Sequence, residues 1–212
     1  MAECNICGGN VFSAAPNNRL SRKKTPPLCN KCGSLERHRI GRDLASTIRI
    51  RETFKTYALL DVEKNATVPK GWFSSHKEIP VSDYEIDQVA KGPEKFDFIV
   101  CSHVIQKVRD PRRMIKQMVK ALSDSGVMLL SYPSPMTRKV TEQVGARRAD
   151  EPFFIFGQDF ERHYGMMAPD TYVVAVDGTD PVTEDHEMMY FLTKNPEWTT
   201  RIVKNLDARL VQ

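Results

Sequence analysis

The sequence lacks an apolar run long enough to cross a bilayer, for which about 20 consecutive apolar residues are needed. Its first residues, MAECNICGGN, lack the basic and then apolar pattern of a secretory signal. Cysteine is scarce, with five in 212 residues, and four of the five stand in two close pairs. These absences argue against a membrane protein and against an oxidised, secreted scaffold, so a cytoplasmic location is expected.

Excess charge of one sign is also small, because the formal net charge is +4. It is unevenly placed: residues 1–55 carry eleven Lys or Arg against four acids, a local net charge of +7. Such a basic segment could meet nucleic acid or an acidic protein surface. It could equally be a solvated helix and loop, since no aromatic residues interleave with the charges to stack on bases.

The two cysteine pairs have the spacing of a metal site. Cys4 and Cys7 are separated by two residues, as are Cys29 and Cys32, and 21 residues lie between the pairs. Paired Cys-x2-Cys units are typical of tetrahedral zinc sites, in which each tight turn supplies two thiolates. Four cysteines fill all four coordination positions of a tetrahedral zinc ion and leave none open for substrate. The sequence therefore predicts a structural zinc knuckle rather than a catalytic metal.

The rest of the chain alternates apolar runs with amphipathic segments. We predict strands at 56–62, 71–79, 96–102, 127–132, 171–176 and 187–193. Helices are predicted at 34–50 and 111–122, with a short one at 137–147. At most a turn or two joins the first two strands, because residues 63–70 are few and include Pro69. This alternation indicates an α/β fold.

Four segments follow from these patterns. They are a zinc knuckle at 1–33, a linking amphipathic helix at 34–55, an α/β domain at 56–195 and a C-terminal helix or tail at 196–212. In the last segment Trp198, Ile202, Leu206 and Leu210 recur at four-residue steps, as on one face of a helix.

Several stretches together resemble a known family. The cysteine pairs running into CGSLERHR, then GWFSSHKEI, FDFIVCSHVIQKVRDPRRMIKQMVKALSDSGVMLLSYP and FGQDFERHYG are similar to class I S-adenosylmethionine-dependent methyltransferase-like proteins with an N-terminal zinc knuckle. The resemblance implies a doubly wound, mostly parallel, Rossmann-like methyltransferase sheet. It also implies S-adenosylmethionine as a cofactor, lying across the carboxyl ends of the first strands.

Placed on this sequence, the resemblance implies cofactor-binding residues at Asp61, Glu63, Glu78, Ser102 and His103. Glu78, or Asp83 as an alternative, would hold the ribose, although either could be a surface acid. Candidate catalytic residues are His103, His163 and Tyr164. A lone histidine is also commonly a hydrogen-bonded structural residue, and the segment around His163 could be a loop anchored by hydrogen bonds.

The sequence departs from the family at two places. The first strand is followed by no glycine before Gly71, where the family has a small-residue loop that lets the cofactor approach the backbone. After His103 the chain reads Ile105, Gln106 and Lys107, where the family commonly has Leu-Glu-His. An acid is therefore lost, and a cation is added near the position expected for a sulfonium.

Three functions remain open on this basis. The first is an active methyltransferase of unknown substrate, since methyl transfer depends mainly on positioning two reactants. The second is a methyltransferase fold without catalysis that serves as a binding module or complex subunit, with an unknown protein partner. The third is a docking factor for nucleic acid or protein that uses the knuckle and the basic segment.

Overall fold

A seven-stranded sheet forms the centre of the molecule. The computed structural model describes residues 2–65, 67–133, 138–145, 151–165 and 170–211. The strands lie in the order β11-β9-β10-β6-β5-β3-β4. Their bounds are β3 Ala58–Val62, β4 Ser75–Ile79, β5 Phe96–Ser102, β6 Leu122–Ser131, β9 Tyr172–Thr179, β10 His186–Thr193 and β11 Ala208–Leu210. From β4 to β6 neighbours pair in parallel, and β10, β9 and β11 add antiparallel pairs.

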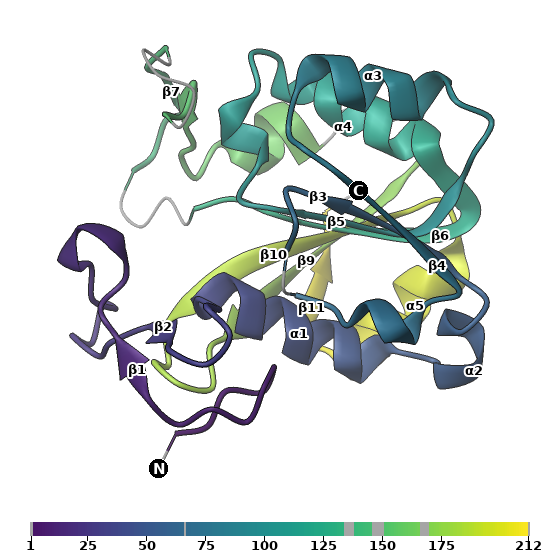
Figure 1. Cartoon of the computed structure of the whole chain (residues 1–212). Helices are drawn as coiled ribbons and strands as arrows, with labels where there is room; N and C mark the ends of the chain where they lie inside the picture. The colour runs from purple at the N-terminus through teal and green to yellow at the C-terminus, as the bar shows by residue number, and fades with distance from the viewer. Residues whose placement is uncertain (1, 66, 134–137, 146–150, 166–169, 212) are drawn as a thin grey trace.

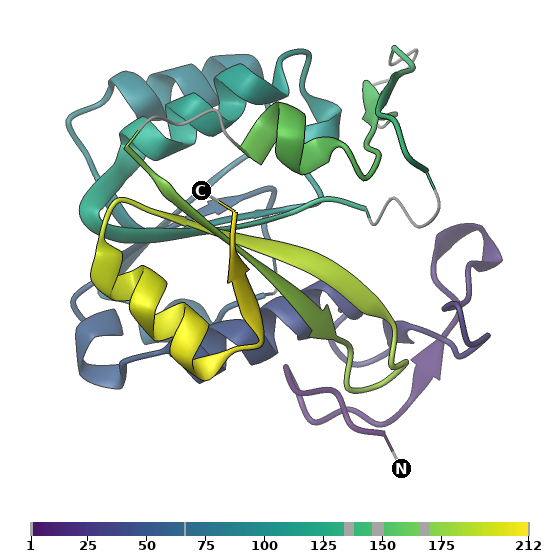
Figure 2. The same cartoon turned by 180° about the vertical axis from the view of Figure 1, so that it is seen from behind.

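Helices cover both faces of this sheet (Figures 1 and 2). On one face lie α1 Glu36–Ile48 and α5 Pro196–Asn205, with the short α2 Arg51–Phe54 beyond α1; on the other lie α3 Asp83–Lys91 and α4 Pro111–Ala121. Each face buries its own apolar cluster. The α/β class and the doubly wound, mostly parallel sheet are therefore confirmed. No helix in the described residues is long and apolar enough to span a membrane.

The strand at 96–102 and the helix at 111–122 form as predicted. Pro111 begins α4, and the Asp110 side chain caps it by accepting a hydrogen bond from the Arg113 amide at 2.9 Å. The crossover from β3 to β4 holds only a one-turn 3-10 helix, η2 Lys70–Trp72, in keeping with its length and proline. Because η2 includes Gly71 and Trp72, the strand expected at 71–79 starts only at Ser75, in β4. Strand β6 starts at Leu122, five residues before the expected start at 127, because a register irregularity between Phe96 and Phe98 accommodates the added residues.

Two segments differ from the sequence-based prediction. Helix α3 was not predicted, although Ser82 caps it by accepting from the Glu85 amide at 3.1 Å, because only Ile86 and Val89 are buried along it. The short helix expected at 137–147 is not formed in its described part, 138–145. That part contains the strand β7 Glu142–Gln143, which pairs with β8 Phe154–Ile155.

The C-terminal segment is only partly the helix that its four-residue steps indicate. Trp198 and Ile202 are buried in α5, but the helix ends at Asn205. Leu210 lies in β11, which pairs with β9 at the sheet edge, and is 55% exposed. The apolar spacing therefore continues past the point where the backbone changes from helix to strand.

The N-terminal knuckle lies beside α1 (Figure 1), and Arg39 of that helix joins it to the body. Its main pieces are β1 Phe12–Ser13, the 3-10 turn η1 Pro16–Asn18 and β2 Leu28–Cys29. The guanidinium of Arg39 donates to both carboxylate oxygens of Asp180, each at 2.7 Å, and to the carbonyl oxygens of Pro27 and Ser34. Both side chains of the ion pair have no solvent exposure. Knuckle, α1 and the β9–β10 turn are thus held by one buried pair.

Replacement of Arg39 by Met should lower the free energy of unfolding by about 3–5 kcal/mol, because Asp180 then stays buried without its counter-charge. Urea denaturation measures the change. The double variant Arg39→Met/Asp180→Asn should lose less free energy of unfolding than the sum of the losses in Arg39→Met and Asp180→Asn, since it leaves no unpaired buried charge. As a control, Lys23→Ala removes an exposed pair with Glu184 and should cost less than about 1 kcal/mol. Equal losses in Lys23→Ala and Arg39→Met would contradict this account.

Candidate functional site

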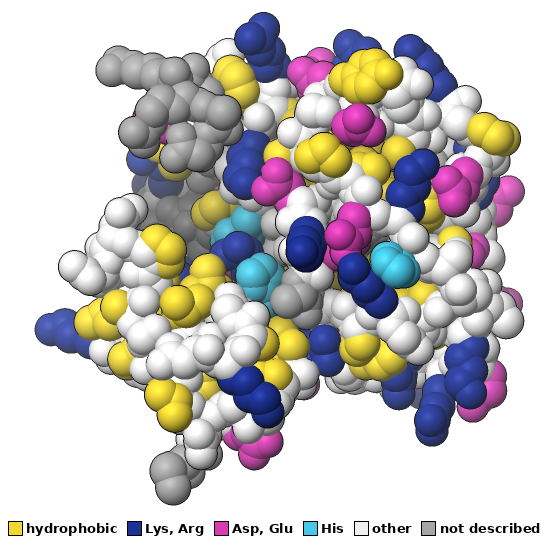
Figure 3. All heavy atoms as spheres, viewed as in Figure 1, with side chains coloured by type: hydrophobic (Ala, Val, Ile, Leu, Met, Phe, Trp, Pro, Cys, Tyr) yellow, Lys and Arg dark blue, Asp and Glu magenta, His cyan; other side chains and the backbone are white. Residues whose placement is uncertain are grey.

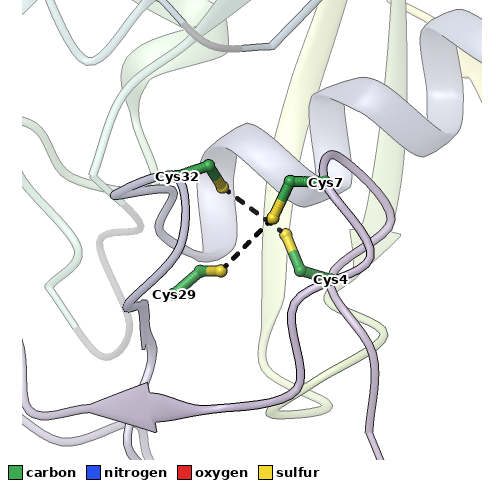
Figure 4. A group of neighbouring side chains, drawn as sticks. All are labelled: Cys4, Cys7, Cys29 and Cys32. Atoms are coloured by element: carbon green, nitrogen blue, oxygen red, sulfur yellow. Dashed lines mark hydrogen bonds between the residues drawn. The ribbon is translucent and has the colours of Figure 1, made fainter.

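The four paired cysteines converge with their sulfur atoms pointing toward one another (Figure 4). Their sulfur atoms all lie within 4.8 Å of one another, with Cys4 and Cys32 3.8 Å apart and Cys7 and Cys29 3.6 Å apart. Zinc–sulfur bonds of about 2.3 Å in a tetrahedron require sulfur atoms about 3.8 Å apart. The cluster could therefore hold one metal ion.

Backbone packing around the cluster fits this use. The amides of Cys7 and Gly8 donate to the carbonyl oxygen of Cys4, and the Gly33 amide donates to that of Cys29. A Cβ atom added to Gly9 would lie 3.1 Å from the sulfur of Cys29 and 3.3 Å from that of Cys7. The two turns are thus folded tightly onto the sulfur atoms.

The thiols differ in acidity. Burial raises the pKa of Cys4, but hydrogen bonds from Ser34 and from the amides of Ile6 and Cys7 more than offset it and bring the pKa to about 7. Burial and the neighbouring thiols raise the pKa of Cys7 to about 12. One thiolate therefore forms readily, whereas a full set of thiolates needs a bound cation.

A second group of polar residues lies where β3 and β5 end. Asp61 is 2% exposed, and its Oδ1 atom accepts a hydrogen bond from the Asn65 amide at 2.8 Å. Burial raises the pKa of Asp61 to about 6, against the partly offsetting hydrogen bonds from Asn65. Ser102 at the end of β5 is buried and lies 3.1 Å, oxygen to oxygen, from Ser131 of β6. Three strands thus contribute buried oxygen atoms to one edge.

The turn after β3 has an unusual backbone. Glu63 and Lys64 have φ values of 71° and 52°, the left-handed region that favours glycine. Lys107, in the 3-10 turn η3 Ile105–Lys107 that follows β5, donates to Glu63 at 2.9 Å. The turn that lacks glycine is therefore strained and is linked by an ion pair to the turn after β5.

His103 follows β5 directly and has φ 55°, also left-handed. Its amide donates to the Ser131 carbonyl oxygen at 3.0 Å, and its own carbonyl oxygen accepts from the Gln106 side chain at 2.7 Å. The Nε2 atom lies 2.6 Å from a carboxylate oxygen of Glu187, at the start of β10. The strained backbone thus aims the imidazole at an acid 84 residues away in the sequence.

One buried acceptor at this edge has no partner. The Oε1 atom of Gln106 is buried and makes no hydrogen bond within the described part of the chain. An unpaired buried carbonyl oxygen costs about 1–3 kcal/mol, so a ligand that donates a hydrogen bond there would be stabilised. In the sequence, Gln106 stands out only as a departure from the family pattern.

The other predicted site residues make their contacts outside this group, although Glu78 neighbours Asp61. Glu78 lies near the end of β4, beside Asp61 in the strand register, but pairs with Lys70. Asp83 is the first residue of α3. His163 lies in the π-helical turn η4 Glu161–Gly165 and faces Asp159, with an Nε2–Oδ2 distance of 3.7 Å. Tyr164 belongs to the same turn, and its side chain lies outside the described residues.

A cavity of about 460 Å³ lies between the knuckle and the body. His103 and Glu187 line it, together with Arg19 of the knuckle and Arg37 of α1. In the space-filling view the hollow beside the knuckle shows His and basic side chains (Figure 3). Glu187 had no signal in the sequence, because its partner is so distant. Arg37 could have been selected from CGSLERHR, the stretch that carries the resemblance.

Asp61 should make stability depend on pH. Its pKa is raised by folding, so its contribution to stability is present at low pH and is lost as pH rises through about 6. Asn keeps the acceptor for the Asn65 amide without a charge. The gain in unfolding free energy from Asp61→Asn should be about 1–2 kcal/mol larger at pH 8 than at pH 5. Denaturant titrations at both pH values measure it, and a gain independent of pH would contradict the raised pKa.

The chain is 28% identical over 72 residues to the ubiquinone biosynthesis O-methyltransferase of Haemophilus ducreyi. The match covers 34% of this chain and 30% of that protein, so the chain spans under a third of the relative's length.

Solved structures with a similar fold include DesVI of Streptomyces venezuelae, with a TM-score of 0.48 and 11% identity over 76% of this chain and 92% of that one. An S-adenosylmethionine-dependent methyltransferase from Clostridium acetobutylicum gives a TM-score of 0.47 and 11% identity over 74% and 91%. The profile of a family described as "Methyltransferase domain" matches residues 39–170, which include β3, α3, α4, β5 and β6. By this match over more than half of its length, the chain belongs to the methyltransferase domain family, whose cofactor is S-adenosylmethionine.

Proposed function

We propose that the chain binds S-adenosylmethionine across the carboxyl ends of β3, β4 and β5 and transfers its methyl group to an acceptor. Open parallel sheets bind ligands at this edge. The observation that carries the proposal is the set of buried acceptors in the segments that end β3 and β5. They are Asp61, Ser102 and, in the turn after β5, the Oε1 atom of Gln106, which has no partner among the described residues. Such acceptors suit a cofactor with ammonium, amino and hydroxyl donors.

These residues fit the cofactor's chemistry. Asp61 and Gln106 would accept from its donors, and Glu78 is placed to accept from ribose hydroxyls once it releases Lys70. The bound cofactor supplies an electrophilic methyl group on a sulfonium. The chain itself orients the acceptor, keeps water out and accepts a proton, which suffices where rate depends on positioning.

A second candidate is a methyltransferase fold that binds a partner without catalysis. The ion pair between Glu63 and Lys107 favours it, because this pair links the turns after β3 and β5, where a cofactor would approach the backbone. The ammonium of Lys107 would also repel a sulfonium unless Glu63 neutralises it. Cofactor binding therefore separates the two candidates.

The knuckle is proposed to hold one structural zinc ion through Cys4, Cys7, Cys29 and Cys32. Docking of nucleic acid through the basic segment is a weaker proposal, because several of its cations serve the fold. Arg19 donates to both oxygens of Glu36, and Arg39 is buried against Asp180. Arg39 therefore binds the knuckle to the body away from solvent, and Arg19, although 47% exposed, is already paired with Glu36.

Calorimetric titration with S-adenosylmethionine should show binding to the wild-type chain. Gln106→Leu should weaken it about tenfold, because a hydrogen bond to a buried acceptor is lost. Gln117→Leu is the matched control: this glutamine contacts Asp87, between α3 and α4, and its loss should leave binding unchanged. If the wild-type chain binds neither S-adenosylmethionine nor S-adenosylhomocysteine, the second candidate replaces the first.

The purified chain should contain one zinc ion, measured by elemental analysis. Cys29→Ser/Cys32→Ser should lose the metal and melt at a lower temperature, because metal binding contributes to folding. Cys101→Ala is the control, since this fifth cysteine is fully buried in β5 and belongs to the apolar core. It should retain the metal. A serine variant with unchanged zinc content would refute the assignment.

A further inference from the structure

The cavity between knuckle and body contains a cation that the fold does not use. Arg37 lines it, and its Nε atom is buried without a hydrogen-bond partner among the described residues. Burial lowers the pKa of Arg37, while the charges of Glu187 and Glu36 raise it only partly in return. A guanidinium has five N–H donors and no acceptor, so an anion is the ligand that would satisfy it.

Neighbouring charges in the cavity are already engaged. Arg19 and Glu36 form a two-point ion pair at 2.7 and 2.9 Å. The Asp185 carboxylate accepts from the backbone amide of Arg22 at 3.0 and 3.2 Å. Arg37 therefore remains in this wall as a cation with incomplete hydrogen bonding, since its Nε atom has no partner among the described residues.

Opposite this arginine lies the His103–Glu187 pair. The Glu187 carboxylate can only accept, so the Nε2 atom of His103 carries the proton between them. In a neutral imidazole Nδ1 is then an acceptor. No hydrogen bond joins Nδ1 to another described residue. His38 of α1 also lies near, but burial and nearby positive charge lower its pKa to about 3, so it stays neutral.

We propose that this cavity is the binding site of the methyl acceptor, and that the acceptor is a small molecule with a hydroxyl group and an anionic group. Arg37 binds the anion, and Nδ1 of His103 accepts the hydroxyl proton. His103 follows β5 at the edge assigned to the cofactor, so the cavity and the proposed cofactor site meet at this residue.

The reaction balances without another reagent. The acceptor oxygen forms a bond to the methyl carbon as the carbon–sulfur bond breaks, and the electron pair of that bond stays on sulfur. The hydroxyl proton passes to His103, and Glu187 stabilises the imidazolium. S-adenosylhomocysteine and the methyl ether are the products. This inference rests on the proposed methyltransferase function for its second substrate, but the anion site can be tested without it.

The knuckle is part of this site rather than a remote anchor. Ala15, Pro16 and Arg19, which lie between the two cysteine pairs, form one wall of the cavity. Loss of the metal should therefore open the cavity while the edge formed by β3 and β5 stays in place. Loss of the metal should therefore impair acceptor binding and leave cofactor binding intact.

Benzoate and inorganic phosphate serve as probes of the anion site, one for a carboxylate and one for a phosphate. Titration followed by NMR should show that at least one of them binds the full chain. Arg37→Gln should weaken that binding about tenfold or more, because a charge-assisted hydrogen bond is lost. Lys23→Gln is the matched control: this cation lies on the knuckle surface, pairs with Glu184 and should leave binding unchanged. Cys29→Ser/Cys32→Ser should abolish anion binding and retain S-adenosylmethionine binding.

Meta- and para-hydroxybenzoate test the role of His103. At least one should bind more tightly than benzoate, and His103→Leu should remove that advantage while leaving benzoate itself bound. Equal binding of the probes to the wild type and to Arg37→Gln, or no binding of either probe, would overturn the anion site. No preference for a hydroxyl group would overturn the role of His103.

The companion titration with S-adenosylmethionine keeps the two proposals distinguishable. Arg37→Gln should bind the cofactor as the wild type does. A chain that binds the cofactor but shows no Arg37-dependent anion binding would retain the proposed function and lose this inference. A chain with Arg37-dependent anion binding but no cofactor binding would lose the proposed function and keep the anion site.

Discussion

The buried pair of Arg39 and Asp180 is the contact on which the arrangement of the molecule depends. Removing two charges from water costs several kcal/mol for each ion, and the cost is offset only where every donor and acceptor is satisfied. Here Asp180 also accepts from the amide and hydroxyl of Thr183, at 3.0 and 2.7 Å. Because Arg39 further binds the carbonyl oxygens of Pro27 and Ser34, the pair fixes the knuckle and the β9–β10 turn relative to α1.

That fixed geometry links the thiol cluster to the cavity between knuckle and body. The thiol cluster orders the two turns of the knuckle, and the loop between them forms a wall of the cavity that contains His103. Arg39 and Arg37 leave α1 two residues apart, one toward Asp180 and one into the cavity. Helix α1 therefore both holds the knuckle through Arg39 and carries Arg37, the proposed anion-binding residue. A shift of this helix would displace both residues together.

The sequence predicts those features whose cause is local. The thiol spacing, strand 96–102 and helix 111–122 each follow from neighbouring residues, and each is formed. Helix α3 was missed because two buried residues over nine give too weak a period. The pairing of His103 with Glu187 depends on β10 lying beside β6, which no local pattern records. Strand β11 likewise forms by pairing with β9 at the edge of the sheet, and no pattern within residues 208–210 predicts that pairing.

Backbone strain is present where the function is proposed, although it is not confined to that edge. Glu63, Lys64 and His103 are left-handed without being glycine and lie at the carboxyl ends of β3 and β5; Asn17, Asn18, Lys24, Asp170 and Glu184 are left-handed elsewhere in the described residues. Each such residue costs on the order of 1 kcal/mol and persists only where its surroundings fix it. The ion pair of Glu63 with Lys107 and the hydrogen bonds of His103 provide that fixation. Asp61 adds a buried carboxylate with a raised pKa at the same edge. The strained turns and the buried carboxylate thus lie together at the edge where open parallel sheets bind ligands, which favours a ligand site there.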